Sequence, residues 1–333
     1  MAIESRGDLA VNHSNSDIRS ENILAVLEAL AREQHMTRDD LAQRCRLSLT
    51  TVGKILDRLH DYGILSQKHI RSAKSGRSLA AFSLSDSTAF AVFRVSEWEM
   101  IMELTDLRLR ALRHIRQAIM PDRDPGENLI SFLLLCRREL EMARKSILLC
   151  GLIAESNVLE SEMIVRAIET HLKLSATVYD STADAIARAA AYEELTAGGR
   201  CTAVLSNDAS CGGFILCGDS IHSGISAHRQ EYGDLPRSAD DLLQTLQALT
   251  TFFTPDILLI CSTRDTSTLK ENLETALKAS ALPSRPRVEI RNTDRFLALG
   301  VSVALRTEWL AEIHRDSQRL RPRIPVSHSF PDI

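Results

Sequence analysis

Residues 37–63 read TRDDLAQRCRLSLTTVGKILDRLHDYG, and this segment decides the fold of the first part of the chain. Thr37 and Ser48 are good helix N-caps, and each precedes a stretch with apolar residues at helical spacing. The second helix is predicted over 49–62, and Gly63 ends it. Two short helices joined by a tight turn predict a helix-turn-helix. The residues predicted to face its core from the second helix are Val52, Ile55, Leu56 and Leu59.

The other faces of this second helix carry side chains suited to a DNA major groove. Small hydroxyl groups near the N-terminus allow a helix to approach base edges, and cations further along the helix meet phosphates. The predicted DNA contacts of the helix are Ser48, Thr50, Thr51, Lys54 and Arg58.

The flanking sequence completes a winged helix. A further helix is predicted over 22–34, and two hairpin strands are predicted over 64–70 and 79–84. The tip between the strands, RSAKSGRS at 71–78, is basic, and Arg77 is predicted to enter a minor groove. The predicted DNA contacts of the tip are Lys74, Gly76 and Arg77. A winged helix can also serve protein contacts or dimerisation, and the sequence leaves this alternative open.

Charge is unevenly placed along the chain. The net charge is −4, but residues 44–77 hold eight basic residues against Asp57 and Asp61. This leaves a charge of about −10 on the remaining residues. The pattern indicates one module that faces a polyanion and a body with another task, although chance clustering on a solvated face remains an alternative.

The composition is that of a folded, soluble protein. The 333 residues are 44% hydrophobic and 25% charged, and no run of 18 uncharged apolar residues occurs. With a polar start at 1–15, we expect neither a membrane span nor secretion, but a cytoplasmic protein. The seven cysteines form no CxxC pair, the histidines show no metal spacing, and no GxSxG motif occurs. We therefore expect reduced thiols, no metal, no cofactor and no hydrolase site.

From residue 88 onward, strands alternate with helices, which predicts an α/β fold with a mixed sheet covered on both faces. The predicted domains are a winged helix over 17–86, two α/β lobes over 88–195 and 200–313, and a flexible tail over 314–333.

Three short motifs add a family resemblance. They are QEYGDLP at 230–236, preceded by Gly224, CGG at 211–213 and LGVSVA at 299–304. With the order of elements from residue 17 to 309, they resemble the ROK family of bacterial sugar kinases and sugar-responsive repressors. The resemblance implies a winged helix followed by two lobes of an actin-like ATPase fold. It also implies a transcription regulator that is a homodimer or a dimer of dimers, expected to be a repressor in carbohydrate metabolism, on a two-fold DNA operator.

The motifs by which ROK kinases bind ATP and act on sugar are altered here. The phosphate loop DxGGT aligns with RVSEW at 94–98, and the loop of GTGIGGG type aligns with NDASCGG at 207–213. The END segment, whose aspartate is the family's general base, reads YDS at 179–181, and CST at 261–263 replaces the glycines of the adenosine side. Asp234 stands at the position of the zinc-site histidine, and no cysteine cluster follows. Since a phosphate cradle needs glycine backbone N–H groups, we predict a body without kinase activity.

The cleft between the lobes could still bind a carbohydrate effector, because each buried ligand hydroxyl needs a polar partner. The predicted effector contacts are Asp180, Ser181, Glu231 and Asp234. Glu231 holds the family's position of a sugar-hydroxyl acceptor, although an ordinary exposed turn carboxylate is the alternative. Two other functions stay open: a DNA-binding protein whose body only dimerises, and an active sugar kinase.

Overall fold

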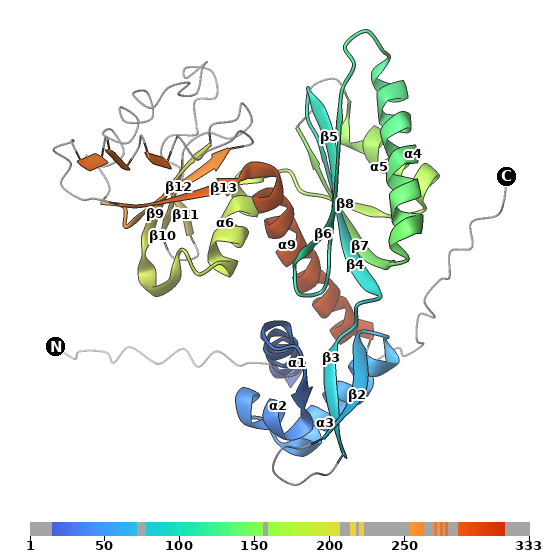
Figure 1. Cartoon of the computed structure of the whole chain (residues 1–333), viewed down its shortest axis with the longest axis vertical. Helices are drawn as coiled ribbons and strands as arrows, with labels where there is room; N and C mark the ends of the chain where they lie inside the picture. Colours follow the sequence, from blue (N-terminus) through green and yellow to red (C-terminus); the bar gives the residue numbers. More distant parts are fainter. Residues whose placement is uncertain are drawn as a thin grey trace, which may run out of the picture. The chain divides into compact units, whose positions relative to one another are not determined.

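The computed structural model describes residues 15–71, 78–155, 159–206, 214–217, 220–222, 254–262 and 286–316, with residues 270–271, 274–275 and 277–278. The chain divides into two compact units (Figure 1). The first comprises the residues up to Asp86 together with those from Thr307 onward, and the second comprises Ser87–Arg306.

The first unit is a winged helix. Its elements are α1 (Asn15–Arg32), β1 (Met36–Thr37), α2 (Arg38–Cys45), α3 (Leu49–Asp61), β2 (Leu65–Arg71) and β3 (Ser78–Leu84). The strands form an antiparallel sheet in the order β1-β3-β2. The three helices bury Leu30, Leu41, Leu56 and Leu59 completely, which confirms the apolar stripe expected for α3. Strand β1 was not expected, because two residues carry no readable periodicity.

Side-chain caps set the bounds of α2 and α3. Thr37 accepts the backbone N–H of Asp40 at 3.2 Å, while the Asp40 carboxylate accepts the backbone N–H of Thr37 at 3.1 Å. This reciprocal capping box begins α2, and Arg46 in the left-handed conformation, with φ 55°, ends it. Ser48 then accepts the backbone N–H of Thr51 at 3.0 Å and begins α3. The turn between the two helices therefore follows from local chemistry.

The second unit contains two mixed sheets, so the α/β fold is confirmed. The first sheet has the order β6-β5-β4-β7-β8 and the second has the order β11-β10-β9-β12-β13. The strands of the first are β4 (Thr88–Val95), β5 (Glu99–Thr105), β6 (Ala111–Ala118), β7 (Ser146–Ala154) and β8 (Ala176–Val178). Those of the second are β9 (Cys201–Ser206), β10 (Phe214–Cys217), β11 (Ser220–His222), β12 (Ile257–Ser262) and β13 (Arg287–Asn292).

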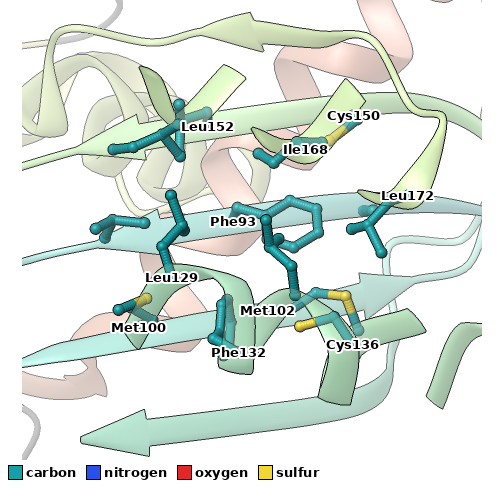
Figure 2. Packing of buried hydrophobic residues seen from close by; sticks show 14 of the residues in the cluster. Phe93, Met100, Met102, Leu129, Phe132, Cys136, Cys150, Leu152, Ile168 and Leu172 are labelled. Carbon is teal, nitrogen blue, oxygen red and sulfur yellow. The ribbon is translucent and has the colours of Figure 1, made fainter. Parts of the chain in front are cut away.

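Helices cover both faces of the first sheet. The described helices of this unit are α4 (Pro125–Ala143), α5 (Ser161–Leu172), α6 (Thr182–Tyr192), the short η1 (Ala197–Gly199) and α9 (Thr293–Asp316), which runs on into the first unit. Figure 2 shows α4 and α5 packing on the sheet through Phe132, Cys136 and Ile168. Phe132 meets Phe93 edge to face with ring centroids 6.4 Å apart. On the other face, Gly151 of β7 leaves room for α9, since a Cβ there would lie 2.5 Å from Val301.

Helices α9 and α6 cross closely at one glycine. A Cβ built on Gly300 of α9 would lie 1.8 Å from the backbone oxygen of Ala185 in α6. Only glycine allows this approach, so the predicted closing motif at 299–304 has a packing role.

One strand was missed by the sequence analysis, and two predicted helices lie wholly or mostly outside the described residues. Strand β6 was not predicted, because Ile115 is its one buried residue and its neighbours include exposed basic side chains. Such an edge strand lacks the apolar alternation on which a prediction depends. The helix predicted over 240–253 lies outside the described residues, and the helix predicted over 267–280 is described only at six helical positions.

Candidate functional site

Helix α3 has one buried side and one exposed side. Its buried side is packed through Val52, Leu56 and Leu59, which have no exposed surface. Thr50 and Lys54, one turn apart, are both exposed. The helix therefore presents a hydroxyl and an ammonium group on one outer face, as base and phosphate contacts require.

The other predicted residues of α3 differ in availability. The Ser48 hydroxyl caps the helix and also lies 2.8 Å from the hydroxyl of Thr51, which is half-buried. Arg58 is half-buried as well. Of the five predicted contacts, Ser48, Thr50 and Lys54 are exposed, and the hydroxyl of Ser48 is engaged in the cap.

Two further residues next to this face were missed by the sequence analysis. Arg38 at the start of α2 reaches across to α3, and its guanidinium lies 3.0 Å from the position of a Cβ on Gly53. Gly53 in a helix interior was the signal for such a close approach. Leu49 is 50% exposed at the N-terminus of α3, where an apolar group can contact a thymine methyl.

The wing is described up to its tip. Strands β2 and β3 pair without interruption from Leu65 opposite Leu84 to Arg71 opposite Ser78. Lys68 and His69 are exposed on this ribbon. Lys74, Gly76 and Arg77, the predicted contacts of the tip, lie outside the described residues.

Of the predicted effector contacts, the structure describes two. Asp180 is exposed after β8, and Ser181 is the N-cap of α6, where its hydroxyl accepts the backbone N–H of Asp184 at 3.1 Å. Glu231 and Asp234 lie outside the described residues, as do positions 207–213 of the second predicted phosphate loop.

Ion pairs surround Arg94, in the segment at 94–98 that the sequence analysis aligned with the first phosphate loop of ROK kinases. Arg94, 6% exposed at the end of β4, donates Nε–H to Glu155 at 2.8 Å and Nη1–H to Asp294. Its Nη1 also lies 3.7 Å from Glu99, which pairs with the half-exposed Arg116. These five residues form what we call the Arg94 cluster. Burial alone lowers the pKa of Arg94, but the surrounding carboxylates outweigh burial and hold that pKa above its ordinary value.

The Arg94 cluster leaves little to attract a phosphate. Three carboxylates surround two guanidinium groups, so the cluster carries excess negative charge. The Arg94 donors point at Glu155 and Asp294 rather than at a ligand. Coulomb repulsion with the phosphates of a nucleotide would follow at this position.

A further buried carboxylate lies in β5. Glu103 is 2% exposed, and its carboxylate lies 3.0 Å from Nδ1 of His114 in β6. Burial raises the pKa of Glu103, partly offset by His114. Within the described residues, no group of three or more His, Cys, Asp or Glu side chains could hold a metal ion. None of the described helices is long and apolar enough to cross a membrane.

This fold defines a class of protein in which a winged helix precedes an α/β body with two mixed sheets. Residues 19–66 match a family model described as winged helix-turn-helix DNA-binding, which confirms the expected N-terminal domain. A comparison with curated proteins found no match.

Solved structures extend the comparison to most of the chain. A crystal structure of a ROK family transcriptional regulator, a homolog of the E. coli MLC protein, is 13% identical with a TM-score of 0.59. That match covers 89% of this chain and 99% of the other, and it confirms the expected ROK regulator fold. The Arthrobacter sp. strain KM inorganic polyphosphate/ATP-glucomannokinase is 14% identical with a TM-score of 0.46, covering 66% of this chain and 99% of its own. A ROK family glucokinase from Streptomyces griseus is 11% identical with a TM-score of 0.45, covering 64% and 97%.

Proposed function

We propose that the protein is a DNA-binding transcription regulator that represses its target genes as a homodimer. The observation that carries the proposal is the outer face of α3, where Thr50 and Lys54 are exposed on the second helix of a helix-turn-helix. In this arrangement α3 lies in the major groove and the β2–β3 wing follows the adjacent backbone. The tip residues Lys74, Gly76 and Arg77 are part of the same proposal.

Selection of genomic DNA fragments by the purified protein tests this function. At about 150 mM salt, nonspecific phosphate binding is weak, so an enriched palindromic site would support a regulator on a two-fold operator. Absence of enrichment from a folded protein, with and without a panel of sugars, would contradict the proposal. The position of the enriched site relative to a promoter, followed by a reporter assay, tests repression.

Variants of α3 assign the binding surface. Lys54→Ala should weaken binding to all sequences and reduce the slope of log affinity against log salt by about one. Thr50→Ala should weaken discrimination at one base position while leaving the salt slope unchanged. Lys278→Ala is a matched control, because Lys278 is an exposed lysine of the second unit. Unchanged DNA binding in both α3 variants would contradict the assignment of α3 as the recognition helix.

We also propose that the body has no kinase activity. The Arg94 cluster supports this, because carboxylates and their paired guanidinium groups stand where the family's first phosphate loop would hold a nucleotide. An assay that couples ADP release to a measurable signal, run across a panel of hexoses, should stay at the background rate. Sugar-dependent ADP release by the purified protein would contradict the proposal.

A carbohydrate effector is the third part of the proposal. Asp180 and Ser181 adjoin the start of α6, and the proposal includes Glu231 and Asp234 as further contacts of the same effector. An effector acts on DNA binding only if its affinity differs between two conformations of the body. Calorimetry against a sugar panel, followed by operator binding with and without the active sugar, tests this. Heat of binding with unchanged operator affinity would refute the regulatory role, and no heat with any sugar would favour a body that only dimerises.

A further inference from the structure

Helix α4 carries large apolar side chains on the side that faces away from its sheet. Ile130, Leu134, Leu135 and Met142 are 42%, 52%, 38% and 56% exposed. Ile130 and Leu134 are one turn apart, so their side chains are neighbours on the helix surface. Exposed apolar side chains that gather on one face mark an interaction site more often than single ones do.

The sequence of the helix explains why this face is apolar. Residues 129–136 read LISFLLLC, which places apolar residues on nearly all sides of two central turns. The sheet side of these turns is buried through Leu129, Phe132, Leu133 and Cys136. A helix that is apolar all round is normally buried on all sides, whereas the described residues bury only one side of α4. A second partner is therefore needed for the outer side.

Charges on this outer face identify the partner. Glu127 lies one turn before Ile130, Arg138 lies one turn after Leu134, and both are exposed. In the described part of the chain, neither forms a salt bridge that would neutralise it. The outer face thus has an acidic end, an apolar centre and a basic end.

We propose that α4 packs antiparallel against α4 of a second copy of this chain, across a two-fold axis level with Phe132 and Leu133. In this register, Glu127 of one copy lies opposite Arg138 of the second copy, and the two-fold symmetry produces this pair twice. Ile130 comes level with Leu135 of the second copy, and Leu134 comes level with Ser131. Opposite charges then flank an apolar centre, which is the arrangement of a polar rim around an interface core.

The ends of the helix are compatible with this register. Glu141, which would come level with Asp124 of the second copy, is already paired with Arg137 at 3.0 Å. Asp124 is engaged as the N-cap, accepting the backbone N–H of Gly126 at 2.8 Å. Each of the two carboxylates therefore already has a partner within its own copy, which reduces the repulsion between them across the interface.

The inference deepens the proposed function, since a dimer is what a two-fold operator requires, and it rests on that function in this respect alone. Its test uses no DNA, so failure of the interface and failure of DNA binding are separate results. The face of a single helix is small against the roughly 800 Å² per partner of a standard interface, so we expect the dimer to dissociate on dilution.

Sedimentation velocity of the full chain over a range of concentrations measures the dimer. Leu134→Glu should raise the dimer dissociation constant at least about tenfold, because two carboxylates would enter the apolar centre. Leu79→Glu is the matched control, since Leu79 of β3 is 38% exposed and lies outside α4. It should leave the constant unchanged, with circular dichroism confirming the fold of both variants.

Charge exchange tests the register. Glu127→Arg and Arg138→Glu should each weaken the dimer about tenfold, because each places like charges opposite one another at two symmetric positions. The double variant should return the dissociation constant to within about threefold of the original value, since the pairs are restored with signs exchanged. A monomer in the unaltered protein, an unchanged dimer in Leu134→Glu, or no recovery in the double variant would each overturn the proposal.

Discussion

Replacing Arg94 with methionine removes the guanidinium of the Arg94 cluster while keeping an unbranched side chain of similar reach. The Asp294 and Glu155 side chains are 2% and 8% exposed. Solvent therefore cannot take over their hydrogen bonds without a rearrangement of the backbone around them. Both carboxylates would stay buried without this guanidinium.

The structure sets the size of the expected effect. Removal of one partner from a buried ion pair typically costs about 3–5 kcal/mol, because an uncompensated charge remains in the interior. We expect a loss of about that size in the free energy of unfolding for Arg94→Met near pH 7. Glu99 adds little to it, since its side chain is more exposed and keeps Arg116.

The loss should depend on pH with a definite sign. A charge that is buried without its partner costs free energy, and protonation of a carboxylate removes that charge. The loss in the variant should therefore be larger at pH 7 than at pH 5. In the unaltered protein the raised pKa of Arg94 keeps its charge across this whole range, so the ion pairs persist.

Urea unfolding followed by circular dichroism at pH 7 and at pH 5 measures both effects. Arg166→Met is the control, because Arg166 pairs with Glu162 at 3.4 Å and both side chains are more than three-quarters exposed. Its free energy of unfolding should change by no more than about 0.5 kcal/mol. A loss below about 1 kcal/mol for Arg94→Met, or equal losses in the two variants, would refute the reasoning.

Three other predictions follow from the surroundings of single residues. Gly300→Ala should cost about 3 kcal/mol or more in thermal or urea unfolding, because a Cβ there would overlap the backbone oxygen of Ala185; a smaller loss would contradict this close crossing. Glu103→Gln should be more stable than the unaltered protein at pH 7, because burial raises the pKa of Glu103 and the ionised form costs stability as pH rises; the gain should vanish below the ordinary pKa of 4.5, and a gain independent of pH would count against it. Burial, with Cys217 at 3.6 Å, raises the pKa of Cys201 to about 12, so its alkylation, followed by mass spectrometry, should accelerate about tenfold for each pH unit between 7 and 9; fast alkylation at pH 7 would contradict this environment.

The helix-turn-helix could be predicted from sequence because its determinants are local. The caps at Thr37 and Ser48 and the apolar stripe of α3 act within a few residues of one another, and the structure has all of them. The same reasoning could not separate Thr50 from Thr51. Both follow the cap, and only the structure shows the Thr51 hydroxyl beside that of Ser48.

The alternation of strands and helices in the α/β body could be predicted from sequence, but the edge strand β6 could not. Strands β4, β5 and β7 consist mostly of apolar residues, which is the sequence signal of a buried strand. Strand β6 was missed because most of its side chains are exposed to solvent, so it has no clear apolar pattern.

The sequence by itself determined the winged helix and the alternation of strands and helices in the α/β body, because each depends on residues close together in the chain. Tertiary structure alone decided what Arg94 does. Its carboxylate partners Glu155 and Asp294 lie 61 and 200 residues away, and no local pattern brings them together. The same holds for the outer face of α4. A run such as LISFLLLC indicates a helix, but only packing against the first sheet decides which side is buried and which is left exposed.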